Sequence, residues 1–321
     1  MFKKQFSEKV FLEGGIVEKV VNMGSMNLDK VYLVEKFVAP GETVHALQYS
    51  ENCGGKGLNQ SIAMARAGVY VYHAGKVGKE GVLLMDYLKK SGVDISFLEE
   101  VTAVNGHAVI QVDQNGQNSI VVCKGSNDLV EKEYIIRVLD QFCSGDILVL
   151  QNEISNVDFA ITEAKERGLK VVFNPSPVND AVFGYRLGDV DCFILNEIEA
   201  AFLADVGEFD MERIIHNLLE KYPQAAFVMT LGEKGSCYFD RSKRICQDIF
   251  QVEAVDTTGA GDTFCGYYIA AMLKGLDIQK RLYIASAASA IAVGRNGAAQ
   301  SIPCLDEVTR FLADGERGKV I

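Results

Sequence analysis

Residues 147–174 read ILVLQNEISNVDFAITEAKERGLKVVFN, with two short apolar runs on either side of an amphipathic segment. The apolar runs Ile147–Leu150 and Val171–Asn174 have the length and composition of buried strands. Between them, Val157–Arg167 repeats its apolar residues at helical spacing. Parallel neighbouring strands need a long crossover connection, which is usually a helix. The segment therefore predicts a strand–helix–strand unit of a parallel sheet.

The same alternation continues along the chain in both directions. It predicts an α/β protein with a mostly parallel central sheet that is flanked by helices on both faces. Further strands are expected at Val20–Met23, Val69–Gly75, Phe193–Leu195 and Phe227–Thr230, and further helices at Gly57–Ala67, Val82–Lys90 and Met211–Lys221.

Two pairs of short strands do not follow this alternation, and each pair surrounds a turn signal. They predict a small separate sheet, inserted as residues 27–52 and 105–124, that covers an active site as a lid or forms a dimer contact. The rest is expected to be an N-terminal extension over residues 1–19 and one domain over residues 20–321. The paired strands are Val31–Phe37 with Thr43–Ser50, and His107–Val112 with Ser119–Lys124.

Composition narrows the classes of partner. The chain has 321 residues, 48% of them hydrophobic, and a net charge of −11. This length suits one large domain with an appendage, and the apolar content suits a packed core. An acidic chain without a Lys/Arg run repels nucleic acid, and no uncharged apolar run is long enough to span a membrane. We expect a small-molecule ligand rather than nucleic acid or a membrane.

Eight cysteines are scattered along the chain, with no metal-ligand or CxxC spacing. The first residues lack the apolar core of a signal peptide. We therefore expect a cytoplasmic protein whose cysteines are reduced thiols.

The string Asp256-Thr257-Thr258-Gly259-Ala260-Gly261-Asp262 precedes an apolar helical segment that ends at Leu273. Free N–H groups at a helix start, together with the helix dipole, attract anions, and small residues let a phosphate approach the backbone. A carboxylate beside such an anion hole is well placed to accept a proton from an attacking hydroxyl. For an isolated motif, an acid that only complements the helix dipole is the alternative. The string matches neither the Walker A loop nor the Rossmann fingerprint.

A second glycine-rich string, Gly54-Gly55-Lys56-Gly57-Leu58-Asn59-Gln60, precedes the helix expected to end at Ala67. A polyhydroxylated ligand suits this string for two reasons. The glycines let backbone amides approach the ligand, and the Asn59 side chain can both donate and accept hydrogen bonds. A glycine-rich turn with a solvated Lys56 is the alternative.

Together these two strings resemble the ribokinase family of PfkB-type carbohydrate kinases, and most of Val20–Pro303 can be followed against that family. DTTGAGDTF from Asp256 resembles its C-terminal signature, and GGKGLNQ from Gly54 resembles the ribokinase version of its N-terminal motif. Four shorter matches lie elsewhere: Asn27-Leu28-Asp29, Asn174-Pro175, Asn196-Glu197-Ile198-Glu199 and Thr230-Leu231-Gly232-Glu233-Lys234-Gly235. The resemblance implies a ribokinase-like α/β fold with a small β-sheet lid.

By this resemblance Asp262 is the catalytic base, and Gly259, Ala260 and Gly261 form the anion hole. Mg²⁺ is expected at Glu199 through water, and K⁺ at a loop site. The sugar-binding residues implied are Asn27, Asp29, Gly55, Lys56, Asn59 and Glu153; the ATP-binding residues are Asn196, Thr230, Gly232 and Gly235; the K⁺ site residues are Asp256, Thr258, Ala292, Arg295, Gly297 and Ser301.

The reaction implied is transfer of the ATP γ-phosphate to the 5-hydroxyl of D-ribose, by a homodimer that associates through its lid sheets. The chain departs from the family pattern at Lys79-Glu80, Cys53, Cys123 and Gly294, and of these Cys53 and Cys123 bear on the identity of the sugar. The alternatives are a kinase of the same family for deoxyribose, fructose or a nucleoside, and a sugar-binding relative without catalysis. The presence of Asp262 argues against the last.

Overall fold

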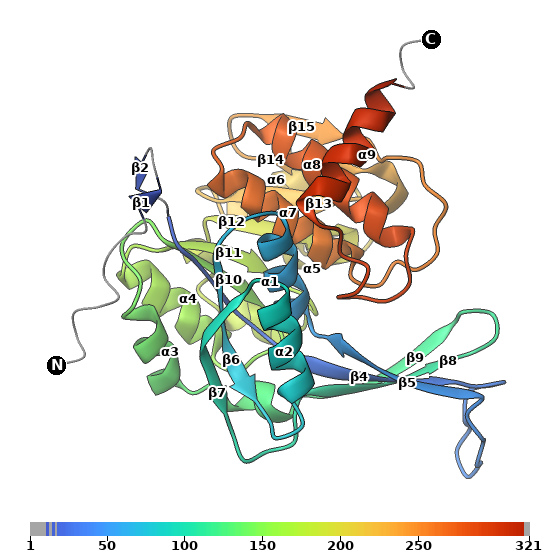
Figure 1. Cartoon of the computed structure of the whole chain (residues 1–321). Coiled ribbons are helices and arrows are strands. Elements are labelled where there is room, and N and C mark those ends of the chain that lie inside the picture. Colours follow the sequence, from blue (N-terminus) through green and yellow to red (C-terminus); the bar gives the residue numbers. More distant parts are fainter. Residues whose placement is uncertain (1–10, 13–14, 17, 318–321) are drawn as a thin grey trace.

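The computed structural model describes residues 11–12, 15–16 and 18–317 and is built around a nine-stranded sheet (Figure 1). Seven neighbouring strands are parallel, and the two at one edge, β14 and β15, are antiparallel. In spatial order the strands are β15 (Arg244–Gln247), β14 (Ser236–Phe239), β13 (Ala226–Thr230), β12 (Cys192–Asn196), β11 (Lys170–Asn174), β10 (Ile147–Gln151), β3 (Val20–Met23), β6 (Val71–Val77) and β7 (Asp94–Glu100).

Helices cover both faces of this sheet, as the sequence predicts. Alternate residues of a strand face opposite sides, so Leu148 and Leu150 join one hydrophobic cluster while Ile147 and Val149 join the other. The first cluster packs against α3 (Lys132–Leu139), α4 (Val157–Glu166), α5 (Glu197–Ala204) and α6 (Met211–Lys221); the second packs against α1 (Lys56–Arg66), α2 (Val82–Lys90), α7 (Ala260–Leu273), α8 (Ile278–Val293) and α9 (Leu305–Arg317).

A separate four-stranded sheet extends from this body as an arm (Figure 1). Its order is β5 (Gln48–Gly54), β4 (Asn27–Leu33), β8 (His107–Val112) and β9 (Asn118–Cys123). The predicted small sheet is therefore present, but β4 begins four residues before the predicted start at Val31 and β5 ends four residues after Ser50. The reason is that Asn27 pairs with Gly54, so the ladder continues to the glycine pair.

The short elements complete the described chain. The hairpin of β1 (Phe11–Leu12) and β2 (Gly15–Ile16) lies in the predicted N-terminal extension, most of which falls outside the described residues. Four 3-10 turns connect larger elements: η1 (Gly125–Leu129), η2 (Asp180–Gly184), η3 (Leu187–Asp189) and η4 (Gly232–Lys234). No helix in the described part of the chain is long and apolar enough to cross a membrane.

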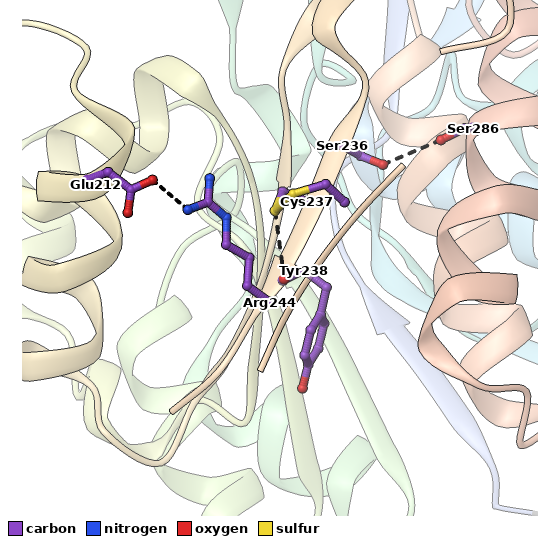
Figure 2. The surroundings of a disulfide bond; sticks show 7 residues. Glu212, Ser236, Cys237, Tyr238, Arg244 and Ser286 are labelled. Atoms are coloured by element: carbon purple, nitrogen blue, oxygen red, sulfur yellow. Dashed lines mark hydrogen bonds and ion pairs between the residues drawn. A yellow bond between two sulfur atoms is a disulfide. The ribbon is translucent and has the colours of Figure 1, made fainter. Parts of the chain in front are cut away.

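One sequence-based expectation is wrong, because Cys237 and Cys246 form a disulfide (Figure 2). The two residues face each other across the antiparallel pair β14–β15, with a Cα–Cα distance of 4.0 Å. The two cysteines are nine residues apart in the chain, a spacing that matches neither a CxxC motif nor a metal-ligand motif. The hairpin that brings them together was not among the predicted strands. The other six cysteines are free thiols.

Candidate active site

Four neighbouring parallel strands end at one edge of the large sheet with polar side chains. Gln151 pairs with Asn174, and Asn196 pairs with Thr230, at the carboxyl ends of β10, β11, β12 and β13. In open α/β sheets ligands bind outside this edge. A cavity of about 210 Å³ lies there, lined by Lys56, Asn174, Ser176, Ile194, Leu195, Asn196, Glu199, Thr230, Thr257, Gly259, Gly261 and Asp262.

The N-terminus of α7 forms one wall of this cavity. Gly259 is the N-cap with φ 75°, a left-handed conformation that favours glycine. A Cβ on Gly259 would also lie 3.0 Å from the Cα of Ala298, whereas a Cβ on Gly261 would meet no atom. The first N–H groups of a helix have no intrahelical acceptor, and the dipole adds positive charge there. The predicted anion hole is therefore at the cavity wall.

Asp262 lies in the first turn of α7 and is only 8% exposed. Its Oδ2 accepts a hydrogen bond from Asn59 Nδ2 at 2.9 Å, and its Oδ1 accepts one from Gln60 Nε2 at 3.0 Å. The carboxylate is held by two donors from α1 and still borders the cavity. The two glycine-rich strings that the sequence singled out thus meet in one site.

Lys56 is the first residue of α1, and its side chain also borders the cavity. Burial lowers the pKa of an ammonium group, but the carboxylates of Asp262, Glu153 and Glu199 raise the pKa of Lys56 above its ordinary value. A cation that stays charged between these carboxylates can bind the anionic phosphates as well as a sugar hydroxyl.

The other predicted sugar-binding residues gather where the arm meets α1. Glu153 Oε2 accepts hydrogen bonds from Lys56 N at 3.0 Å and from the Ser25 hydroxyl. Burial raises the pKa of Glu153, and Lys56 offsets this only in part. Burial and the nearby Glu153 raise the pKa of Asp29 to about 7.

Gly55 and two buried asparagines, Asn27 and Asn59, lie in this region. Gly55 has φ 93°, and a Cβ on it would lie 3.0 Å from the Asn27 amide nitrogen. Asn27 is buried, and its Oδ1 accepts a hydrogen bond from Asn127 Nδ2 at 2.8 Å. Asn59 Oδ1 is buried and has no hydrogen-bond partner among the described residues, so it can accept a ligand hydroxyl.

The predicted nucleotide side lies across the cavity. Asn196 caps α5: its Oδ1 accepts from Glu199 N, and Glu199 Oε2 accepts from Asn196 N, both at 2.9 Å. Asn196, Glu199 and Thr230 border the cavity, whereas Gly232 and Gly235 lie in the turn that follows β13. Both glycines have positive φ, and a Cβ on Gly235 would lie 2.1 Å from the carbonyl oxygen of Gln247. Asn196 therefore caps a helix as well as bordering the cavity.

Two loops that the sequence assigned to K⁺ lie side by side. Asp256 Oδ2 accepts from the Gly297 amide and Oδ1 from the Thr258 amide, both at 2.9 Å. Burial raises the pKa of Asp256, but these hydrogen bonds more than offset it and leave the pKa below its ordinary value. In the second loop Arg295 pairs with Glu307 at 2.6 Å, and Arg295 N donates to the carbonyl of Ala292. Ser301 is buried and donates to the Ala298 carbonyl at 2.7 Å.

Ser176 and Thr257 border the cavity without having been predicted, and Gln60 contacts Asp262 although only its neighbour Asn59 was singled out. Gln60 stood inside the quoted glycine-rich string, so its position was a usable signal. Ser176 follows the Asn174-Pro175 strand end and carried no chemical signal of its own.

Two of the departures from the family pattern, Cys53 and Cys123, lie in strands of the arm. Cys53 is buried in β5, where burial and Asp29 raise its pKa to about 11. Cys123 is exposed at the end of β9. Glu80 accepts a hydrogen bond from Asn105 N at 3.1 Å, so this acid acts in the local structure.

Comparisons with known proteins give a consistent match. The family described as pfkB family carbohydrate kinase matches residues 17–305. The ribokinase of Haemophilus influenzae is 33% identical over 297 residues, which cover 90% of this chain and 97% of that protein. The ribokinase of Bacillus subtilis is 34% identical over 295 residues, which cover 91% and 98%.

A solved structure is similar over the same extent. The structure of Arabidopsis thaliana ribokinase complexed with ribose and ATP superimposes with a TM-score of 0.81 at 28% identity. The match covers 92% of this chain and 99% of that one.

Proposed function

Because the chain belongs to the pfkB family of carbohydrate kinases, we propose that it transfers the γ-phosphate of ATP to the 5-hydroxyl of D-ribose. The observation that carries the proposal is the position of Asp262. This carboxylate lies in the first turn of α7, next to the Gly259–Gly261 amides and in the same cavity as Lys56. A base, an anion hole and a cation are the groups that phosphoryl transfer needs.

The reaction follows from this arrangement. The oxygen of the sugar hydroxyl attacks the γ-phosphorus while Asp262 takes the hydroxyl proton. The bond from phosphorus to the bridging oxygen breaks, and ADP leaves with that electron pair. The amides of Gly259, Ala260 and Gly261 stabilise the negative charge on the transferred group. Lys56 borders the same cavity and supplies positive charge beside the reacting groups.

Two cations complete the proposal. Glu199 is buried and borders the cavity, and both its carboxylate oxygens already accept hydrogen bonds from Asn196. This suits contact with Mg²⁺ through water, and the ion would neutralise phosphate charge when bound. For K⁺, the carboxylate of Asp256 and the carbonyls of the loop 292–301 supply the oxygen donors that such a cation takes. Bound K⁺ would add positive charge beside the anion hole.

Ribose is favoured by the polar groups near the arm. Asn27, Asp29, Asn59 and Glu153 offer amide and carboxyl groups that can hydrogen-bond to neutral sugar hydroxyls. The second candidate function is that of another sugar or nucleoside kinase of this family. The third is that of a silent relative, which binds sugar without catalysing phosphoryl transfer. Asp262 argues against the silent relative, because a binder needs no base.

Measuring kcat/KM by ADP release tests the proposal across D-ribose, 2-deoxyribose, fructose, fructose 6-phosphate and adenosine. We expect ribose to give the highest value. A buried polar site discriminates against an analogue that lacks one hydroxyl, because protein groups are then left unpaired. A higher value for another sugar or nucleoside would reject ribose and keep the kinase, whereas no ADP release with any acceptor would reject the kinase.

We also propose that the protein is a cytoplasmic homodimer that associates through its arms. The supporting observation is apolar exposure on the arm: Tyr49, Ile120, Val121 and Val122 are between 50% and 68% exposed. Exposed sheet faces and edges seek partners. Light scattering after size-exclusion chromatography should give twice the chain mass for the wild type and the single mass for Val121→Glu. A monomeric wild type would refute the dimer.

A further inference from the structure

Three buried amide side chains form a hydrogen-bonded chain from the centre of the sheet to Asp262. Asn22 lies on β3, Gln151 ends β10 and Gln60 lies on α1, and all three are almost inaccessible to solvent. Gln151 Nε2 donates to Asn22 Oδ1 at 2.9 Å and to Gln60 Oε1 at 2.7 Å. Gln60 Nε2 donates to Asp262 Oδ1 at 3.0 Å.

The direction of this chain is set at its far end. Asn22 Nδ2 donates to the backbone carbonyl of Gly57 at 2.8 Å, and a carbonyl can only accept. Asn22 must therefore turn its Oδ1 towards Gln151. Because this oxygen can only accept, Gln151 must donate to it through Nε2. The same Nε2 faces Gln60 Oε1, so Gln60 must turn its own Nε2 towards Asp262. Asn174 supports this direction: its Nδ2 donates to the Ile194 carbonyl at 2.8 Å, so its Oδ1 accepts from Gln60 Nε2 at 3.3 Å.

The reverse orientation of Gln60 would be unfavourable. It would place the Gln60 carbonyl oxygen against the Asp262 carboxylate, and two acceptors repel each other. With Gln60 held as a donor, Asp262 Oδ1 is fixed from one side, while Asn59 fixes Oδ2 at 2.9 Å. The plane of the carboxylate is then defined before a substrate binds, which is what a base aimed at one hydroxyl needs.

We propose that Gln60 is a positioning residue for Asp262, and that Gln151, which makes no hydrogen bond to Asp262, sets together with Asn174 the direction in which Gln60 donates. The proposal rests on the role of Asp262 as the base. It goes beyond that role because it assigns a catalytic effect to a buried glutamine that borders neither substrate.

Substitutions at Gln151 separate orientation from packing. Gln151→Met removes the amide and leaves Gln60 free to keep its direction. Gln151→Glu places a carboxyl group where Nε2 was, and when ionised it can only accept, so Gln60 should turn its Nε2 towards residue 151 and its oxygen towards Asp262. Because burial raises the pKa of the new carboxyl, the kinetics are compared above that pKa, where the group is ionised. Both variants lose the hydrogen bond to Asn22, and the Glu carboxylate also faces Asn22 Oδ1, so the effect on Gln60 is separated by the double variant described below.

We expect kcat to fall about 10- to 100-fold in Gln151→Glu, because misplacing a reacting group has effects of this size. The loss in Gln151→Met should be clearly smaller, and KM for sugar and ATP should stay within about twofold in both, since neither residue binds substrate. Gln60→Glu keeps the acceptor for Gln151 and replaces the donor to Asp262, so it should match Gln151→Glu. This variant serves as the test if Gln151→Glu does not fold.

Non-additivity gives the decisive comparison. In a Gln60→Met background, Gln151→Glu should cause no further loss of kcat, because the side chain that it turns is gone. Tyr134→Phe is the matched control: it removes a buried hydroxyl that donates to two carbonyls on the other side of the sheet, at 3.2 and 2.7 Å. We expect its kcat to be unchanged.

Additive losses, equal losses in Gln151→Met and Gln151→Glu, or the same loss in Tyr134→Phe would overturn the positioning role. Failure of the underlying function has a different signature. If Asp262→Asn retained turnover, the base assignment itself would fail. If Asp262→Asn were inactive while Gln151→Glu and Gln60→Glu behaved like the wild type, only the positioning role would be wrong.

Discussion

Asn59 and Asp262 are 203 residues apart in the chain, yet Asn59 Nδ2 donates a 2.9 Å hydrogen bond to Asp262 Oδ2. This bond joins the first turn of α1 to the first turn of α7. The sugar-binding string and the phosphate-binding string therefore share one pair of packed helices, and the base depends on how closely those helices approach.

Replacing Asp262 by Asn tests the base directly. The isosteric amide keeps the shape but cannot take the proton, so kcat should fall about 10²- to 10⁴-fold. Binding of ATP and ribose, measured by titration calorimetry, should change little. Asp86→Asn on the exposed face of α2 is the control and should leave kcat unchanged. Turnover of Asp262→Asn near the wild-type rate would contradict the assignment.

Close approach of α1 and α7 depends on Gly266. A Cβ at this position would lie 2.4 Å from the Ala63 Cβ and 2.9 Å from the Gln60 carbonyl oxygen. Gly266→Ala should therefore push the helices apart and lower the free energy of unfolding by about 1–3 kcal/mol. Because Asn59 and Gln60 move with α1, kcat should fall too.

The matched control for Gly266→Ala is Gly207→Ala, where a new Cβ meets no atom. Urea unfolding and steady-state kinetics on both variants check the prediction. Wild-type stability and activity in Gly266→Ala would show that the packing tolerates a methyl group.

Much of this arrangement could be predicted from the sequence. The strands at residues 147–174 were predicted within one residue, because short apolar runs with a helical stretch between them have few other solutions. The meeting of Asn59 with Asp262 was implied only by family resemblance. Periodicity describes single elements and cannot say which helices pack together.

The amide chain was beyond sequence reasoning for a related reason. Asn22 and Gln151 lie within or at the end of apolar strands, where each reads as an isolated polar residue. Only the pairing of β10 with β3 brings them within hydrogen-bonding distance. The disulfide was missed in the same way, because it depends on the register of β14 and β15.

The cation proposal predicts activation by K⁺. The Asp256 carboxylate bridges the two loops through the Thr258 and Gly297 amides. A cation held by nearby oxygens would order both loops and the Gly259 amide that follows. We expect kcat to be several-fold higher in K⁺ than in tetramethylammonium at equal ionic strength. Equal rates in the two salts would refute the cation site.

Thiol counting tests the disulfide. In denaturant without reductant, six of the eight cysteines should react with a thiol reagent, and all eight should react after reduction. A bridge that closes a loop this short contributes about 2–3 kcal/mol in the chain-entropy description, so reductant should lower the unfolding midpoint. Cys246→Ser should lower it similarly and should show no further effect of reductant. Eight reactive thiols before reduction would show that the cysteines are reduced.

The raised pKa of Asp29 predicts how stability depends on pH. In the folded protein, burial and Glu153 raise this pKa from 3.8 to about 7. The folded state therefore binds more protons than the unfolded state between these values, and stability from this group is lost as pH rises through that window. Asp29→Asn mimics the protonated acid at every pH.

The excess of the melting temperature of Asp29→Asn over that of the wild type, measured without sugar, should be larger at pH 8 than at pH 5, because only part of the stability from Asp29 is lost at pH 5. If the difference between Asp29→Asn and the wild type were the same at both pH values, Asp29 would not titrate in this window. If the difference were larger at pH 5, the pKa of Asp29 would be lowered rather than raised in the folded protein. The folded protein would then stabilise the ionised carboxylate.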